Sequence, residues 1–211
     1  MSRPDIAAVT AVAPVIPVLT IEDIRDAVPI ASALAKGGLR ALEITLRTDV
    51  ALDAISIIAR DVPDAVTGVG TVLEPAQFEQ ARRAGAQFAV SPGCSPALVA
   101  AAREAQMPYL PGVQTVSEAM VLREQGFQFL KFFPADAAGG VAWLKAVAAP
   151  LAGLRFCPTG GIGAQTAPAY LDLANVACIG GSWVAPREAV AAGDWQRIEQ
   201  LAAAAVALKR R

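Results

Sequence analysis

The segment 129–134 (FLKFFP) holds a single lysine, Lys131, inside an apolar run that ends at a proline. Aromatic, β-forming neighbours predict a buried strand. Lysine is rarely buried without a partner, and desolvation disfavours the ammonium form, which frees the amine for Schiff-base chemistry with a carbonyl. The alternative is a strand-end lysine whose stem lies along apolar surface while its amine reaches solvent.

A second set of chemical groups lies in segment 42–47 (LEITLR). The alternation of a strand places Glu43, Thr45 and Arg47 on one side. A carboxylate and a guanidinium near a lysine would form a proton-shuttling acid/base with an anion clamp. The alternative for Glu43 is a structural salt bridge. An ionised Glu43 beside Lys131 favours the ammonium, so burial must outweigh this attraction or the two groups must share a proton.

The chain contains no histidine. This absence excludes a Ser-His-Asp triad, a histidine-bound zinc site and a histidine general base. Any chemistry must therefore use lysine, carboxylates, tyrosine, cysteine, arginine or the backbone.

Turn-forming residues follow several of the expected strands. Thr71 follows a glycine-rich strand and offers a hydroxyl to a ligand, although this piece taken alone favours the alternative, a tight turn with a helix cap. Pro92 belongs to a turn that would form a pocket wall. The segments 158–162 (PTGGI) and 180–183 (GGSW) both contain paired glycines. Two such loops after the last two strands favour a phosphate site made of backbone N–H groups.

Apolar runs alternate with helical patterns along all 211 residues, and no linker or low-complexity segment divides them. This pattern predicts a single-domain α/β protein, residues 1–211, folded as a (β/α)8 TIM barrel, with an open doubly wound sheet as the alternative. Catalytic groups of such barrels lie at the carboxyl ends of the strands. The expected strands cover residues 15–19, 40–45, 66–70, 87–91, 108–110, 127–133, 155–158 and 176–180. The expected helices lie near 22–36, 50–60, 75–84, 96–105, 115–125, 141–149, 165–172 and 195–208.

Composition bounds the possible partners. The chain is 55% hydrophobic and 18% charged, with a net charge of -1. It offers no basic face for nucleic acid or an anionic membrane, and no apolar window of about 18 residues. Residues 1–5 lack the pattern of a signal peptide, so we expect a cytoplasmic protein. Reduced thiols are expected for the three cysteines, with Cys157 and Cys178 in the core and Cys94 on a more accessible loop.

These motifs together resemble one family over nearly the whole chain and in the same order. The family is that of the aldolases for 2-keto-3-deoxy-6-phosphogluconate (KDPG) and 4-hydroxy-2-oxoglutarate (KHG). The resemblance implies a homotrimeric TIM barrel of the Entner–Doudoroff pathway. It would be a class I aldolase that cleaves KDPG to pyruvate and glyceraldehyde 3-phosphate, and KHG to pyruvate and glyoxylate. The matching segments are 15–18 (VIPV), 42–47 (LEITLR), 70–73 (GTVL), 91–93 (SPG), 131–135 (KFFPA), 156–162 (FCPTGGI) and 180–183 (GGSW).

The resemblance also implies a role for each site residue. Lys131 would form the Schiff base with the substrate ketone, and Glu43 would move the protons. Because the iminium supplies the polarisation that a Lewis acid would give, neither a metal nor a cofactor is expected. Arg47 and Thr71, with Pro92 beside them, would bind the pyruvyl carboxylate, and Phe133 would pack on the substrate. The phosphate would be held by Thr159, Gly160, Gly161, Gly181 and Ser182.

Two other classes compete with an aldolase. One is a phosphosugar isomerase or epimerase on the same barrel, although the histidine-based versions are unavailable to this chain. The other is a non-catalytic barrel that binds sugar phosphates. Borohydride trapping separates the first class from an aldolase, and a coupled assay for pyruvate release separates the second. The preferred keto acid stays open among gluconate-derived, galactonate-derived and unphosphorylated compounds, with the paired glycines favouring a phosphorylated one.

Overall fold

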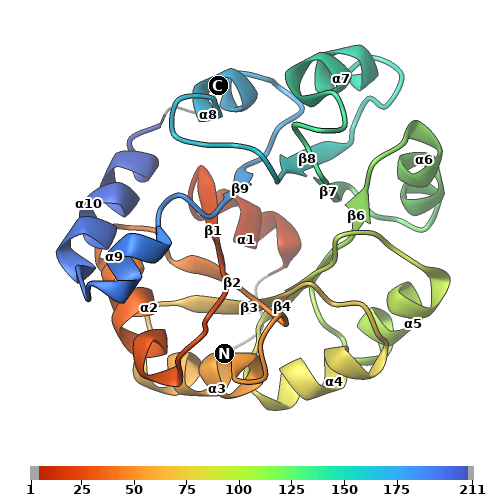
Figure 1. Ribbon diagram of the computed structural model, residues 1–211. Coiled ribbons are helices and arrows are strands. Elements are labelled where there is room, and N and C mark those ends of the chain that lie inside the picture. Colours follow the sequence, from red (N-terminus) through yellow and green to blue (C-terminus); the bar gives the residue numbers. More distant parts are fainter. Residues whose placement is uncertain (1–4, 209–211) are drawn as a thin grey trace.

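Parallel strands lie at the centre of the computed structural model, and most of the helices surround them in a ring (Figure 1). The structure describes residues 5–208. The strands are β1 (Val15–Leu19), β2 (Ala41–Thr45), β3 (Val66–Gly70), β4 (Phe88–Val90), β5 (Tyr109–Leu110), β6 (Gly112–Val113), β7 (Phe129–Phe132), β8 (Arg155–Pro158) and β9 (Ile179–Gly181). The helices are α1 (Ile6–Ala11), the 3-10 helix η1 (Ile24–Asp26), α2 (Ala27–Lys36), α3 (Ala51–Asp61), α4 (Ala76–Arg83), α5 (Pro96–Glu104), α6 (Val116–Glu124), α7 (Gly140–Val147), α8 (Ala167–Leu171), α9 (Arg187–Ala191) and α10 (Trp195–Val206).

The strands form two parallel sheets that together curl around a common axis. One sheet has the order β5-β4-β3-β2-β1-β9, and the other has the order β6-β7-β8. The residue between β5 and β6 is Pro111, which has no N–H to donate to a ladder. Isolated parallel bridges, Phe156 with Val176 and Thr159 with Gly180, link the β8 segment to the chain that leads into β9. The protein is thus an α/β fold with a curled parallel sheet.

The expected alternation of strands and helices is confirmed, with three differences. The strand expected at 108–110 is present as β5, but a further strand, β6, follows it after Pro111. The helix expected at 22–36 is a 3-10 turn followed by α2, because Asp23 caps η1 by accepting the backbone N–H of Arg25. Helices α1 and α9 were not expected at all. Both have only five or six residues, which is too short for a helical period to stand out.

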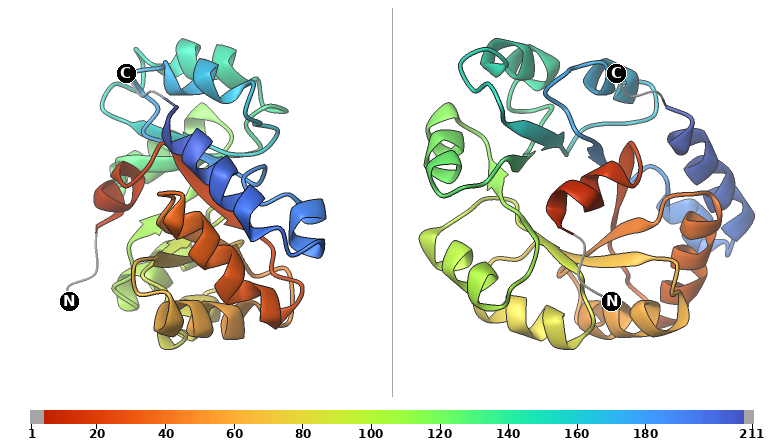
Figure 2. Two further views of the ribbon diagram at one scale, coloured as in Figure 1. Left: turned by 90° about the vertical axis from the view of Figure 1, so that its left-hand side faces the viewer. Right: turned by 180° about the vertical axis from the view of Figure 1, so that it is seen from behind.

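Helix α1 lies across the middle of the ring on one side, which faces the viewer in the right-hand panel of Figure 2. Its Val9 belongs to a compact apolar cluster with side chains from the inner face of the strands. This inner cluster closes one end of the curled sheet with apolar atoms. Its members are Val9, Ile16, Ala41, Phe88, Val90, Leu110, Cys157 and Cys178.

The outer helices pack on the sheet through their apolar faces, and several begin at a side-chain cap. The Thr115 side chain accepts the N–H of Glu118, and the Glu118 side chain accepts the N–H of Thr115, which makes a capping box. The Ser95 side chain caps α5 by accepting the N–H of Leu98. None of the helices within residues 5–208 has the length and apolarity needed to cross a membrane.

Candidate active site

Lys131 and Glu43 form a buried ion pair inside the curled sheet. The Nζ atom of Lys131 donates to Oε1 of Glu43 at 3.1 Å, and the two residues are only 4% and 3% exposed. The ring of Phe133 lies 5.3 Å from the same Nζ, measured to its centroid. Because water has almost no access to the pair, the attraction between the two groups is little screened by solvent.

Strand register explains why these two residues meet although 88 positions separate them. Side chains of register partners in a parallel sheet point to the same face. Glu43 is aligned with Gly68, which is aligned with Phe88 of the inner cluster. Lys131 is aligned with Cys157, which belongs to the same cluster. Both side chains therefore point inward, on the same face of the strands as the inner cluster.

Arg47 and Thr71 lie together at the carboxyl ends of the neighbouring strands β2 and β3. Nε of Arg47 donates to Oγ1 of Thr71 at 3.2 Å. Thr71 has a φ of 59°, in the left-handed region that β-branched residues rarely adopt. Such backbone strain gathers at ligand sites, where the surrounding structure enforces it. The contact gives the Arg47 guanidinium a fixed orientation while leaving its other donors for an anion.

Pro92 lies half-buried on the loop between β4 and α5. The preceding Ser91 is buried, and its Oγ lies 2.5 Å from the hydroxyl of Tyr109. Tyr109 also donates to the Cys94 thiol. Burial raises the pKa of Tyr109 well above its ordinary value, so its hydroxyl stays protonated as a donor. These bonds anchor the loop that carries Pro92.

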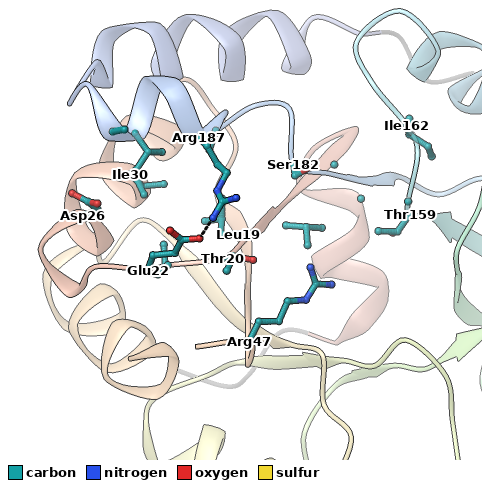
Figure 3. A pocket seen from close by; sticks show the side chains of 18 of the residues that line it. Leu19, Thr20, Glu22, Asp26, Ile30, Arg47, Thr159, Ile162, Ser182 and Arg187 are labelled. Carbon is teal, nitrogen blue, oxygen red and sulfur yellow. Dashed lines mark hydrogen bonds and ion pairs between the residues drawn. The ribbon is translucent and has the colours of Figure 1, made fainter. Parts of the chain in front are cut away.

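A cavity of about 780 Å³ is lined by residues at the carboxyl ends of β1, β2, β7, β8 and β9 (Figure 3). Lys131, Glu43, Thr71 and Pro92 are not among the residues that line it. Phe133 lines the cavity and lies near Lys131 Nζ, which connects the two regions. The expected site residues that line it are Arg47, Phe133, Thr159, Gly160, Gly161, Gly181 and Ser182.

The loop after β8 forms the glycine-rich wall of this cavity. Gly161 has a φ of +78°, and a β-carbon there would lie 2.4 Å from Cβ of Asp136. The loop is held down by the N–H of Ala135, which donates to the Thr159 carbonyl at 2.8 Å. Glycine at 161 thus allows a close backbone approach that leaves the loop open to a ligand.

Charged residues of two further segments also line the cavity and were not among the expected site residues. Glu22, Asp23 and Asp26 come from the chain after β1, and Arg187 is the first residue of α9. A hydrogen-bonded pair with Arg25 lowers the pKa of Asp23 to about 2. The signal that would have found them is their position after β1 and β9, because carboxyl ends of parallel strands share one edge.

The remaining candidates for a functional site are possible metal ligands and the three cysteines. Within the described part of the chain, no three His, Cys, Asp or Glu side chains are grouped so that they could hold a metal ion. Cys157 and Cys178 are buried in the inner cluster as expected, and Cys94 is half-buried on its loop.

Comparison with known proteins gives one consistent family. The model described as "Aldolase: KDPG and KHG aldolase" matches residues 6–201. The KHG/KDPG aldolase of Escherichia coli (strain K12) is 51% identical over 193 residues, covering 92% of this chain and 91% of that protein. The 2-dehydro-3-deoxy-phosphogluconate aldolase of Dickeya dadantii is 50% identical over 194 residues, covering 92% and 91%. A Legionella pneumophila KDPG aldolase structure, with pyruvate captured at low pH as a covalent carbinolamine intermediate, has a TM-score of 0.93 at 45% identity, covering 95% of this chain and 98% of that one.

Proposed function

Since this chain belongs to the KDPG and KHG aldolase family, we propose that it is a class I aldolase, a carbon–carbon lyase, that cleaves KDPG to pyruvate and glyceraldehyde 3-phosphate. It would also cleave KHG to pyruvate and glyoxylate. The observation that carries this proposal is the buried 3.1 Å contact between Lys131 Nζ and Glu43 Oε1 beside a cavity that contains anion-binding groups.

The reaction begins when the proton shared by the pair moves to Glu43 and leaves a neutral amine on Lys131. The amine adds to the C2 ketone to give a carbinolamine. Glu43 returns a proton to the carbinolamine hydroxyl, which leaves as water, and an iminium remains. The apolar walls around the pair keep bulk water away from this exchange.

The iminium then accepts the electrons of the breaking bond. The C4 hydroxyl gives its proton to the Glu43 carboxylate, the C3–C4 bond breaks, and glyceraldehyde 3-phosphate departs while a pyruvate enamine stays on Lys131. Protonation at C3, with Glu43 as the proton donor, regenerates the iminium. Water adds to it, and hydrolysis releases pyruvate and the free amine.

The other proposed residues hold the substrate at its two ends. Arg47 and Thr71 would bind the pyruvyl carboxylate beside Pro92, supported by the Arg47–Thr71 hydrogen bond at 3.2 Å. Phe133 would pack on the substrate, supported by its position between Lys131 and the cavity. The polar end and its phosphate would be held by Thr159, Gly160, Gly161, Gly181 and Ser182.

Borohydride reduction in the presence of pyruvate tests the covalent step. It should convert the imine to a stable secondary amine on Lys131, and peptide mass mapping should find it there. Lys145, an exposed lysine on α7, serves as the internal control and should stay unmodified. Absence of the adduct, or an equal yield on Lys145, would rule out the proposed mechanism.

The proposal extends to architecture and assembly. We propose that the curled sheet is a closed (β/α)8 barrel within one domain. The β8–β9 bridges and the single residue between β5 and β6 support closure.

We also propose a cytoplasmic homotrimer, supported by the family resemblance and by the exposed Met120 and Val121 on α6, which an interface would cover. Sedimentation equilibrium should give three times the 21.7 kDa chain mass, and a monomer would contradict assembly.

A further inference from the structure

Two arginines reach into the cavity from opposite walls (Figure 3). Arg47 follows β2, and Arg187 begins α9 after β9. Within the described residues, these are the basic side chains that line the cavity. A ligand with an anionic group at each end would match this arrangement, because each end would meet one guanidinium.

Arg47 is already directed toward one end of such a ligand. Its Nε is bonded to Thr71 at the carboxyl end of β3, next to the strand that carries Glu43. The carboxylate that Arg47 binds must remain close to the reacting ketone, since both belong to the pyruvyl group. The second anionic group of the substrate therefore needs a different cation.

The wall near Arg187 is otherwise acidic. Glu22, Asp23 and Asp26 line it, and among residues 5–208 Arg25 is a further arginine partner, of Asp23, at 2.5 Å. A phosphate dianion entering this part of the cavity would meet repulsion from the carboxylates. Backbone N–H groups and the hydroxyl of Ser182 supply hydrogen bonds but no positive charge. A cation from α9 offsets that repulsion.

Arg187 is ion-paired with Glu22 at the cavity wall, and this pair can exchange partners at little cost. The two side chains are 87% and 60% exposed. Exposed ion pairs contribute little free energy because solvent screens them. A guanidinium binds phosphate in a bidentate manner with shorter, stronger hydrogen bonds, so a phosphate competes well with one solvated carboxylate.

We propose that Arg187 is a specificity-determining residue, which leaves Glu22 and binds the phosphate of the phosphorylated keto-acid substrate. This inference rests on the proposed aldolase function and assigns one more residue to its phosphate end. Glu22 is the competing anion, and its charge limits how tightly the phosphate binds.

The test compares KDPG with 2-keto-3-deoxygluconate, which lacks only the phosphate. For Arg187→Gln, kcat/KM for KDPG should fall about ten- to hundredfold, mainly through KM, as expected for one charged hydrogen-bonding group. The fall should exceed that for the unphosphorylated compound by at least about tenfold. Arg187→Lys should restore part of the preference, because lysine keeps the charge without the fork.

Two further variants sharpen the result. Glu22→Gln should lower KM for KDPG several-fold, because it removes the competing carboxylate. Arg197→Gln is the matched control: Arg197 on α10 is paired with Glu188 at 3.2 Å and lies outside the cavity lining, so both substrates should react as in the unchanged protein.

Equal losses for the two substrates in Arg187→Gln, or no loss for KDPG, would overturn the assignment. Borohydride trapping with pyruvate keeps this outcome apart from a failure of the aldolase function, because pyruvate carries no phosphate. If pyruvate is trapped in both the unchanged protein and Arg187→Gln, and the variant keeps the same substrate preference, the role of Arg187 is refuted while the aldolase function stands. Absence of trapping in the unchanged protein refutes the aldolase function and the role together.

Discussion

Gly70 leaves the space that the Glu43 carboxylate occupies. A β-carbon on residue 70 would lie 2.3 Å from Oε1 and 2.5 Å from Cγ of Glu43, closer than real β-carbons approach other atoms. The side chain of Glu43 could not keep its contact with Lys131 if this space were filled. The position of the proposed proton carrier therefore depends on the absence of one side chain on the neighbouring strand.

Gly70→Ala should consequently lower kcat/KM about a hundredfold by displacing the carboxylate by about 1 Å. Steady-state kinetics measures this effect. Gly163→Ala is the matched control, since a β-carbon at 163 meets no atom within 4 Å. Comparable activities for the two variants would show that the position of Glu43 tolerates the shift.

Removing either member of the buried pair should separate covalent bonding from proton transfer. Lys131→Ala should abolish turnover, because the described residues that line the cavity include no lysine that could replace it. Glu43→Gln should slow turnover but leave slow imine formation, detectable by borohydride reduction.

Lys131→Ala should also lower the free energy of unfolding by about 3 kcal/mol, since it leaves the Glu43 carboxylate buried and unpaired. Urea unfolding of Lys131→Met/Glu43→Gln should recover most of that loss, and no recovery would contradict this explanation.

Arg47→Ala should raise KM for pyruvate in the direction of condensation, because the carboxylate loses its charged partner. The expected increase is about tenfold or more. The kcat value should change less, since Lys131 and Glu43 stay in place. A KM equal to that of the unchanged protein would exclude Arg47 from carboxylate binding.

Two threonines on neighbouring strands should respond oppositely to valine. Thr67 is fully buried, and among the described residues its Oγ1 is the buried side-chain atom without a hydrogen-bond partner. Thr67→Val should therefore raise the free energy of unfolding by about 1 kcal/mol. Thr45 Oγ1 donates to the Leu19 carbonyl at 2.8 Å, so Thr45→Val should cost about 1–2 kcal/mol. Denaturant unfolding of both variants measures these changes. A change in the free energy of unfolding that has the same sign in both variants would refute the contrast.

The Cys94 thiol should react slowly with iodoacetamide at neutral pH. Burial raises its pKa above the ordinary value of 9.0, so less of the reactive thiolate is present than in an exposed cysteine. The alkylation rate of the native protein should therefore keep rising with pH beyond 9. The unfolded state loses the thiol proton at a lower pH than the folded state does. The thiol therefore lowers the free energy of unfolding as pH rises above its pKa in the unfolded state. A rate that levels off below pH 9 would contradict the shift.

The sequence predicts the strands of this fold well because apolar runs and turn residues mark them locally. It also singles out Lys131 and Glu43, because charged residues inside apolar runs are rare. The geometry of their contact was not readable, since it depends on the register of β2 and β7 and on the space above Gly70. Arg187 was missed for a similar reason: nothing local distinguishes it from a surface arginine until α9 brings it beside Glu22.

The pairing of β1 with β9 has a consequence for synthesis on the ribosome. Val15 is aligned with Ile179, so β1 cannot pair with β9 until residue 179 has been translated. A nascent chain that stops before residue 179 exposes an unpaired edge of β1 and is prone to aggregate with other chains. Chaperone binding to stalled chains should therefore persist until this late segment emerges from the exit tunnel.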